Sequence, residues 1–123
     1  RRFTVLFVVA LVVGGLFACS TSTPGGQEQS CPQDLPSACP NDPPSFKSEV
    51  HAIIDARCGG CHTDGGVAAS ARDFSSYALI AGQRSPILNQ FYACKMPPAD
   101  AGKPTPEERQ ALLTWLVCRA PDN

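Results

Sequence analysis

The residues best suited to chemistry form a Cys-x-x-Cys-His motif near the middle of the chain, Cys58-Gly59-Gly60-Cys61-His62. Two cysteines three residues apart can each form a thioether with one vinyl group of a haem, and the histidine that follows can ligate the iron. Without haem, the same thiols could serve as a redox dithiol or as half of a zinc site. Those uses require a βαβ context or a second pair of ligands, and neither is clear in the sequence. The spacing therefore predicts covalent haem attachment at Cys58 and Cys61, with His62 as the proximal ligand.

A second candidate ligand lies downstream in Lys95-Met96-Pro97-Pro98, which contains the only methionine of the chain. A thioether sulfur is a soft ligand that suits haem iron, although a lone methionine more often fills space in a core. A proline restricts the residue before it to extended conformations. We therefore expect Met96 to lie in a stiff, extended loop.

The Cys-x-x-Cys-His motif followed by Met96-Pro97-Pro98 resembles the class I c-type cytochromes, which are small one-haem electron carriers. The resemblance implies a small all-α, cytochrome c-like domain of about four short helices around one covalently bound haem c. It implies His62 and Met96 as the axial ligands of the iron. The implied function is one-electron transfer between redox partner proteins, with no catalytic residues and no small-molecule substrate.

Three other classes of protein remain as alternatives. A haem enzyme or a haem sensor would need an exchangeable distal site, and a structural zinc module would use Cys58 and Cys61 with other thiols. His51 lies two helical turns before the motif, and we expect it on the surface rather than on the iron. Side chains that could contact the haem propionates are Tyr77, Arg84 and Trp115.

The first helix must deliver the motif. Phe46, Val50, Ile53 and Ile54 recur at helical spacing, which predicts a helix from about residue 46 to residue 57 that begins after Ser45 or Asp42.

Three shorter signals predict the remaining helices. Residues 76–81 form a helical stretch with Gly82 as its natural stop. Ser85-Pro86 is typical of an N-cap and first helical position, and would open a short helix through Tyr92. Thr105-Pro106-Glu107-Glu108 is a capping box with proline at the first helical position, so the last helix should run from there to Cys118.

The N-terminal region predicts export and attachment to a membrane. Arg1-Arg2 precedes an apolar run that ends at Leu16-Phe17-Ala18-Cys19, as in a secretory signal. A small residue before a cysteine looks like the lipobox of a bacterial lipoprotein. We therefore expect a signal peptide at 1–18 and a lipid on Cys19, or an uncleaved apolar anchor. Either one would hold the protein to the periplasmic or cell-surface side of a bacterial membrane.

Residues 19–44 are rich in Ser, Gly and Pro and are expected to be a flexible linker, with the cytochrome c-like domain at 45–121. The charge is balanced, with 10 Lys and Arg against 11 Asp and Glu, and no basic run suggests nucleic acid.

Seven cysteines in so short a chain indicate an oxidising compartment. Once lipid and haem are assigned, four remain, and three pairings are possible. We favour Cys31–Cys39 as a small local loop and Cys94–Cys118 as a bridge between the Met96 loop and the last helix.

Overall fold

The structure is a computed structural model and describes residues 31–123. All regular elements within that range are helices, which confirms the prediction of an all-α fold. The predicted signal peptide at 1–18, the predicted lipidation site Cys19 and the first part of the predicted linker lie outside the described residues. No helix between residues 31 and 123 is long and apolar enough to cross a membrane.

The first helical stretch carries the Cys-x-x-Cys-His motif and is longer than predicted. It begins after Ser45, whose hydroxyl accepts a hydrogen bond from the backbone N–H of Ser48 at 3.3 Å. The helix continues through the motif and ends at His62 instead of Arg57, so both cysteines lie on helix. Its consecutive segments are η1 Phe46–Val50, α1 His51–Ile54, η2 Asp55–Gly59 and α2 Gly60–His62.

The other helices match the sequence signals, with small shifts. The helix predicted at 76–81 is present one residue later: Ser76 caps it by accepting a hydrogen bond from the N–H of Leu79, and Gly82 is its last residue instead of the stop after it. The next helix begins at Arg84, before the predicted Ser85-Pro86 start, because Gln83 takes the N-cap position and Pro86 fits in the first turn without a hydrogen-bonded N–H. The predicted capping box is confirmed in both directions at the start of the last helix. The bounds are α3 Tyr77–Gly82, α4 Arg84–Tyr92 and α5 Pro106–Val117.

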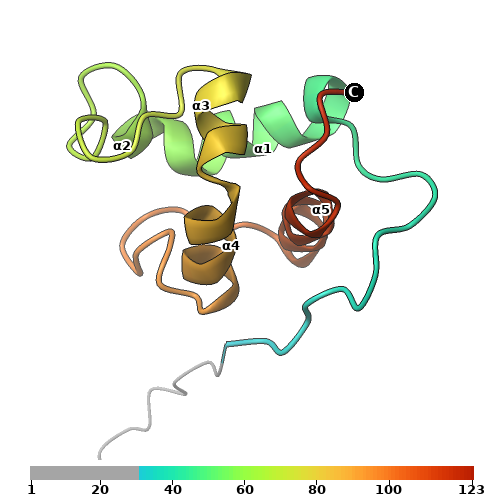
Figure 1. The fold of residues 1–123 in the computed structure, drawn as a ribbon. Coiled ribbons are helices and arrows are strands. Elements are labelled where there is room, and N and C mark those ends of the chain that lie inside the picture. The colour runs from blue at the N-terminus through green and yellow to red at the C-terminus, as the bar shows by residue number, and fades with distance from the viewer. Residues whose placement is uncertain (1–30) are drawn as a thin grey trace, which may run out of the picture.

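The core forms where the first helical stretch and α4 meet α5. In Figure 1 the first stretch runs across the top of the view while α5 is seen nearly end-on, so the two helices cross. Trp115 of α5 is fully buried and its ring stacks on Phe46 at 5.4 Å between centroids. Val50 and Ile54 are buried in the same cluster as Leu112 and Leu116, which are on α5. This packing holds the motif-bearing helix against the most strongly capped helix of the domain.

Both predicted disulfides, Cys31–Cys39 as a small local loop and Cys94–Cys118, are wrong. The structure pairs Cys31 with Cys94 and Cys39 with Cys118. Residues 31–44 contain no regular helix and run along the domain as an extended strap. The strap therefore brings Cys31 to the end of α4 and Cys39 to the end of α5. The predicted domain boundary at residue 45 falls inside this cross-linked unit.

Arg109 of α5 binds the strap from the interior of the domain, and its side chain is buried, at 8% exposure. Its guanidinium makes a two-point ion pair with Asp34 of the strap, at 2.8 and 2.9 Å. It also donates to the carbonyl oxygens of Phe91 and Tyr92, at 2.9 and 3.1 Å, and lies over the Phe91 ring. These carbonyls belong to the last turn of α4, where no intrahelical donor is left for them. One side chain thus joins the strap, α4 and α5.

Two ion-paired carboxylates should make the free energy of unfolding depend on pH in the acid range. Hydrogen bonding to Arg109 lowers the pKa of Asp34, and hydrogen bonding to Arg57 lowers the pKa of Glu108, which also caps α5. A carboxyl group whose folded pKa is lowered stabilises the fold above its unfolded pKa, and this contribution is lost as pH falls through the folded value. We expect the free energy of unfolding, measured by urea titration, to fall as pH drops below about 4–5. The double variant Asp34→Asn, Glu108→Gln should be less stable at neutral pH and show a flatter acid dependence; an unchanged acid slope would contradict this origin.

Candidate haem-binding site

Cys58 and Cys61 are the two cysteines within residues 31–123 that form no disulfide. They lie one helical turn apart, so their side chains share a face of the helix, and both line the same cavity. Burial, assisted by the nearby Cys61, raises the pKa of the Cys58 thiol to about 11. A redox-active dithiol needs a thiol with a lowered pKa. The environment of Cys58 therefore argues against the dithiol alternative.

His62 is held by a hydrogen bond that determines its tautomer. Its Nδ1 lies 2.8 Å from the backbone carbonyl oxygen of Arg72. A carbonyl oxygen can only accept, so Nδ1 carries a proton, and in the neutral imidazole the lone pair is then on Nε2. This is the arrangement in which a histidine binds a metal through Nε2 while its other nitrogen is oriented by the backbone. His62 lines the cavity together with Cys58 and Cys61.

The loop after the motif returns to the helix and fixes its end. The N–H of Ala68 donates to the carbonyl oxygen of Cys61 at 2.9 Å, and the N–H of Phe74 donates to that of His62 at 2.8 Å. Gly66 sits so close to Cys61 that a Cβ there would overlap the Cys61 carbonyl group. By contrast, a Cβ on Gly60 within the motif would meet no atom within 4 Å.

These two glycines give a matched pair of substitutions. Gly66→Ala should lower the free energy of unfolding by about 1–3 kcal/mol, since the loop must move away from the motif. Gly60→Ala should be neutral or stabilising by up to about 1 kcal/mol, because Gly60 has helical backbone angles and open space around it. Urea titration of both variants checks this. Equal effects at the two positions would show that the close approach at Gly66 is unimportant.

The cavity beside the motif has a volume of about 440 Å³, within the range of roughly 300–1,000 Å³ that is usual for cofactor sites. Most of its wall is apolar and includes Ile54, Phe74, Ile80, Ile87, Phe91 and Leu112. The charged side chains that line it are two guanidinium groups, Arg57 and Arg72, and no carboxylate does so. Arg57 is already ion-paired with Glu108, so Arg72 is the cation at the cavity without a carboxylate partner among the described residues. These walls suit a large apolar group that carries negative charge at its edge, as the propionates of haem do.

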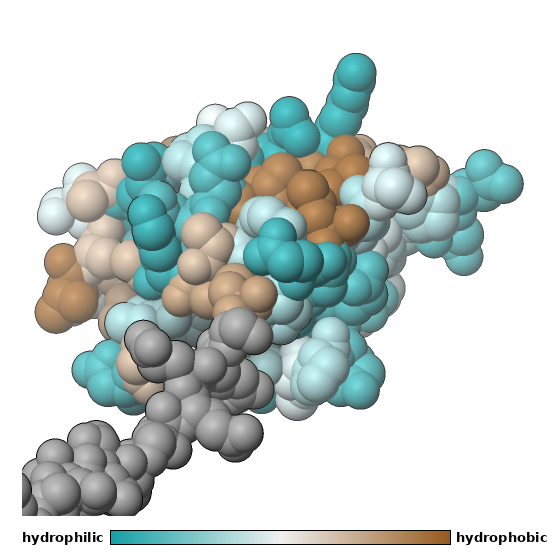
Figure 2. Space-filling model, turned by 90° about the horizontal axis from the view of Figure 1, so that it is seen from below, coloured by the Kyte–Doolittle hydropathy of each residue, from teal (hydrophilic) through white to brown (hydrophobic). Residues whose placement is uncertain are grey.

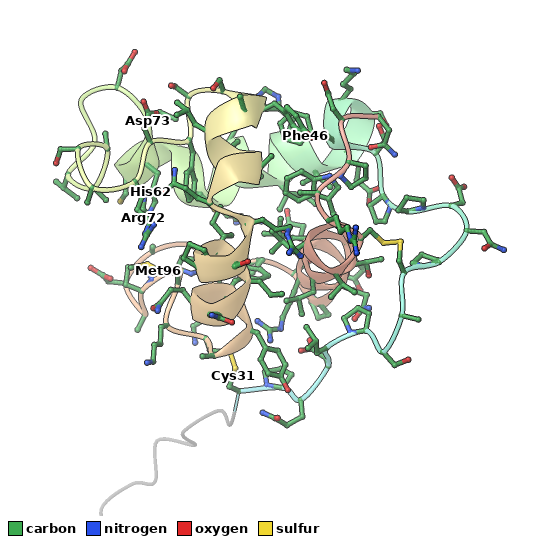
Figure 3. The ribbon with its side chains drawn as sticks, in the orientation of Figure 1. Cys31, Phe46, His62, Arg72, Asp73 and Met96 are labelled. Carbon is green, nitrogen blue, oxygen red and sulfur yellow. A yellow bond between two sulfur atoms is a disulfide. The ribbon has the colours of Figure 1, made fainter. Side chains whose placement is uncertain are left out.

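Met96 lies on the loop that faces the motif across the cavity (Figure 3) and is one of the lining residues. The carbonyl oxygen of Gln90 accepts hydrogen bonds from the N–H groups of Lys95 and Met96, at 2.9 and 3.2 Å. The Cys31–Cys94 disulfide holds the same loop from its other side. Met96 nevertheless keeps 43% of its surface exposed, so this loop covers one side of the cavity without closing over its sulfur.

Apolar side chains are also exposed on the molecular surface. Figure 2 shows brown apolar areas between teal hydrophilic side chains on the face seen from below. Among the described residues, four large apolar side chains are well exposed, namely Leu35, Val67, Leu79 and Met96. Val67 and Met96 both line the cavity, so part of this exposed apolar surface belongs to the site.

The three side chains suggested as propionate contacts lie away from the cavity. Each donates its polar hydrogen to a backbone carbonyl: Tyr77 to Ala120 at 2.8 Å, Arg84 to Leu116 at 3.0 Å and Trp115 to Pro121 at 2.9 Å. Their donors are thus used to hold the C-terminal segment and the end of α5. Spacing in the sequence could not reveal this, because the contacts depend on how α5 and the segment after it pack in the fold.

His51 is on the surface, as predicted. Half of its side chain is exposed, and Nε2 lies 3.7 Å from the carboxylate of Asp55 one turn later. It is not among the residues that line the cavity.

Sequence reasoning missed five polar or aromatic residues of the cavity wall, namely Arg57, Arg72, Phe74, Gln90 and Phe91. Arg57 carried a local signal, since it directly precedes the first motif cysteine. The other four carried none, because their place at the cavity depends on the path of the loop and of α4.

Within residues 31–123 no group of three or more His, Cys, Asp or Glu side chains is arranged to hold a metal ion. The described chain thus offers Cys58 and Cys61 no second pair of zinc ligands, which weighs against a structural zinc module. Comparison of the chain with protein-family models, with curated proteins and with solved structures finds no match.

Proposed function

We propose that this protein is a monohaem c-type cytochrome that carries single electrons between redox partner proteins. One observation carries the proposal. The two cysteines of residues 31–123 that form no disulfide lie on the same helical stretch as a histidine whose Nδ1 is hydrogen-bonded to a backbone carbonyl, and all three line an apolar cavity with the chain's only methionine opposite.

The residues present fit a haem. Cys58 and Cys61 would hold it covalently, and His62 and Met96 would be the axial ligands of its iron. When bound, haem c supplies the one-electron chemistry of iron. The chain itself positions the ligands, keeps the imidazole in one tautomer and surrounds the site with apolar side chains that exclude water.

A covalently bound porphyrin would also complete the core. The described domain is small, and small domains bury too little apolar surface to be very stable without added cross-links or cofactors. A haem in the cavity would contact the first helix, α4 and α5 together. We therefore propose the arrangement of about four short helices around one haem.

The exposure of Met96 supports a second candidate function, a haem protein with an exchangeable distal site. A ligand loop that leaves the sulfur 43% exposed could release the iron to a small molecule, as a haem enzyme or sensor requires. Carbon monoxide added to the ferrous protein separates the two functions. An electron carrier with a stable Met96 ligand should not bind it, whereas an exchangeable site should.

We also propose that the protein is tethered to the periplasmic or cell-surface side of a bacterial membrane through a lipid on Cys19. The motivation is the sequence Leu16-Phe17-Ala18-Cys19 after an apolar run. Mass spectrometry of membrane-extracted protein should show loss of residues 1–18 and added acyl mass. An intact, unmodified N-terminus would mean that the apolar run is itself the anchor or that the protein is not tethered in this way.

The direct test of the proposed function is to express the chain in cells with working c-type cytochrome maturation. After denaturing electrophoresis, a haem-peroxidase stain should colour the polypeptide, and the purified protein should show the visible spectrum of a six-coordinate low-spin haem c. Cys58→Ser with Cys61→Ser should abolish the stained band. Cys31→Ser with Cys94→Ser, which removes a disulfide of the same domain outside the motif, should retain it.

A colourless wild-type band would contradict haem attachment. A coloured band that survives loss of Cys58 and Cys61 would contradict the attachment site.

A further inference from the structure

We propose that Phe74 is a positioning residue that fixes the plane of the His62 imidazole, so that Nε2 keeps one direction toward the iron. The proposal rests on the proposed function and assigns Phe74 a role beyond filling the core.

The hydrogen bond to Arg72 alone does not prevent the His62 imidazole from tilting about Nδ1. It fixes the position of Nδ1, at 2.8 Å from the carbonyl oxygen. The ring can still tilt about that contact, because a carbonyl oxygen accepts over a broad range of directions. A tilt changes the direction of Nε2, on the opposite side of the ring. A second constraint is therefore needed to define the ring plane.

Phe74 supplies that constraint. Its ring lies nearly parallel to the imidazole, with centroids 4.4 Å apart and planes 15° apart. Stacked aromatic pairs of this kind add roughly 0.5–1.5 kcal/mol beyond the area they bury. Phe74 is itself 7% exposed and packed in the core cluster, so it cannot easily follow a tilting imidazole.

Hydrogen bonds from Gln83 hold the segment that carries Phe74 in place. The side-chain amide of Gln83 donates to the carbonyl oxygens of Asp73 and Leu79, at 3.1 and 3.2 Å. Its amide oxygen accepts from the guanidinium of Arg72 at 3.2 Å. The N–H of Phe74 closes the arrangement by donating to the carbonyl oxygen of His62 at 2.8 Å. Residues 72–74 thus contact His62 through its ring nitrogen, its ring face and its backbone.

A matched pair of variants separates positioning from packing. Phe74→Leu removes the ring face that stacks on His62. Phe46→Leu removes a ring of the same size that is about equally buried, at 6% exposure, but that lies outside the cavity lining and stacks on Trp115 instead of His62. Phe74→Tyr keeps the stacked ring and should restore the behaviour of the wild type.

Two readouts are needed on the full chain. In the ferric haem-loaded protein, the g-values of the low-spin EPR signal depend on the orientation of the axial ligand planes. In the diamagnetic ferrous protein, NMR measures how fast the His62 Nδ1–H proton exchanges with water. We expect Phe74→Leu to shift the g-values and speed this exchange by about tenfold, the factor that corresponds to about 1.4 kcal/mol. Phe46→Leu and Phe74→Tyr should change neither.

If Phe74→Leu behaves like Phe46→Leu in both readouts, Phe74 is a core residue only and the proposal is overturned. A wild-type chain without haem gives no EPR signal, which would contradict the proposed function. The Nδ1–H exchange can still be measured in that haem-free chain, so Phe74→Leu would test the positioning role independently.

Discussion

Removal of both disulfides should unfold this domain or leave it barely stable. The bridges join residues 63 and 79 positions apart, and closing loops of that length restricts the unfolded chain by about 4 kcal/mol each. Typical domains are stable by only about 5–15 kcal/mol in total. Urea titration should therefore show a loss of several kcal/mol for Cys31→Ala with Cys94→Ala, and a similar loss for Cys39→Ala with Cys118→Ala.

The two bridges should differ in their effect on Met96. Cys94 is two residues before Met96, whereas Cys118 ends α5 away from that loop. Loss of Cys31–Cys94 should weaken the sulfur-to-iron charge-transfer band and admit carbon monoxide to the ferrous form. Loss of Cys39–Cys118 should reduce stability but leave the band in place. If both double variants affect the band equally, the Cys31–Cys94 disulfide does not position the Met96 loop more than the Cys39–Cys118 disulfide does.

Peptide mapping under non-reducing conditions tests the pairing itself. Trypsin leaves Cys31 and Cys39 in one peptide, because no Lys or Arg separates them. That peptide should be found linked to the peptides of both Cys94 and Cys118. Further cleavage before Asp34 separates Cys31 from Cys39 and should leave Cys31 with Cys94 and Cys39 with Cys118. A Cys94 peptide linked directly to a Cys118 peptide would contradict the structure.

Arg109→Ala should be strongly destabilising. It would leave Asp34 without its cation and would remove the guanidinium donor from the carbonyls of Phe91 and Tyr92, of which Phe91 keeps the N–H of Cys94, in a region where Arg109 itself is 8% exposed. Breaking a buried ion pair by removing one partner costs about 3–5 kcal/mol. Urea titration with both disulfides intact measures this loss.

Two controls show whether the buried geometry is the cause. Lys47→Ala removes a cation from an exposed pair with Asp122, where side-chain exposures are 68% and 51%; such pairs contribute at most about 1 kcal/mol. Arg109→Lys keeps the charge but cannot reach Asp34 and two carbonyls with one planar group, so it should recover only part of the loss. An Arg109→Ala variant as stable as Lys47→Ala would show that the strap is held by its disulfides alone.

Local patterns in the sequence determined most of the helices and the nature of the candidate site. The capping box at Thr105 and Glu108 and the N-cap at Ser76 are made by atoms within one turn, so they are recognisable without the rest of the fold. The spacing of Cys58, Cys61 and His62 likewise depends on one helical turn. Their grouping on one cavity wall follows once that stretch is helical.

The disulfide pairing, the extent of the domain and the surroundings of His62 were decided by tertiary structure. Cys31 and Cys39 are close in sequence, which suggested a local loop, but the extended strap carries them to the ends of different helices. Tyr77, Arg84 and Trp115 have the chemistry to bind a propionate, yet each donates to a backbone carbonyl of α5 or of the segment that follows it. The contacts that orient His62 come from residues 72–74, and only the path of the loop brings them to the imidazole. In each case the partner is remote along the chain, so packing of the whole domain selects it and local spacing does not.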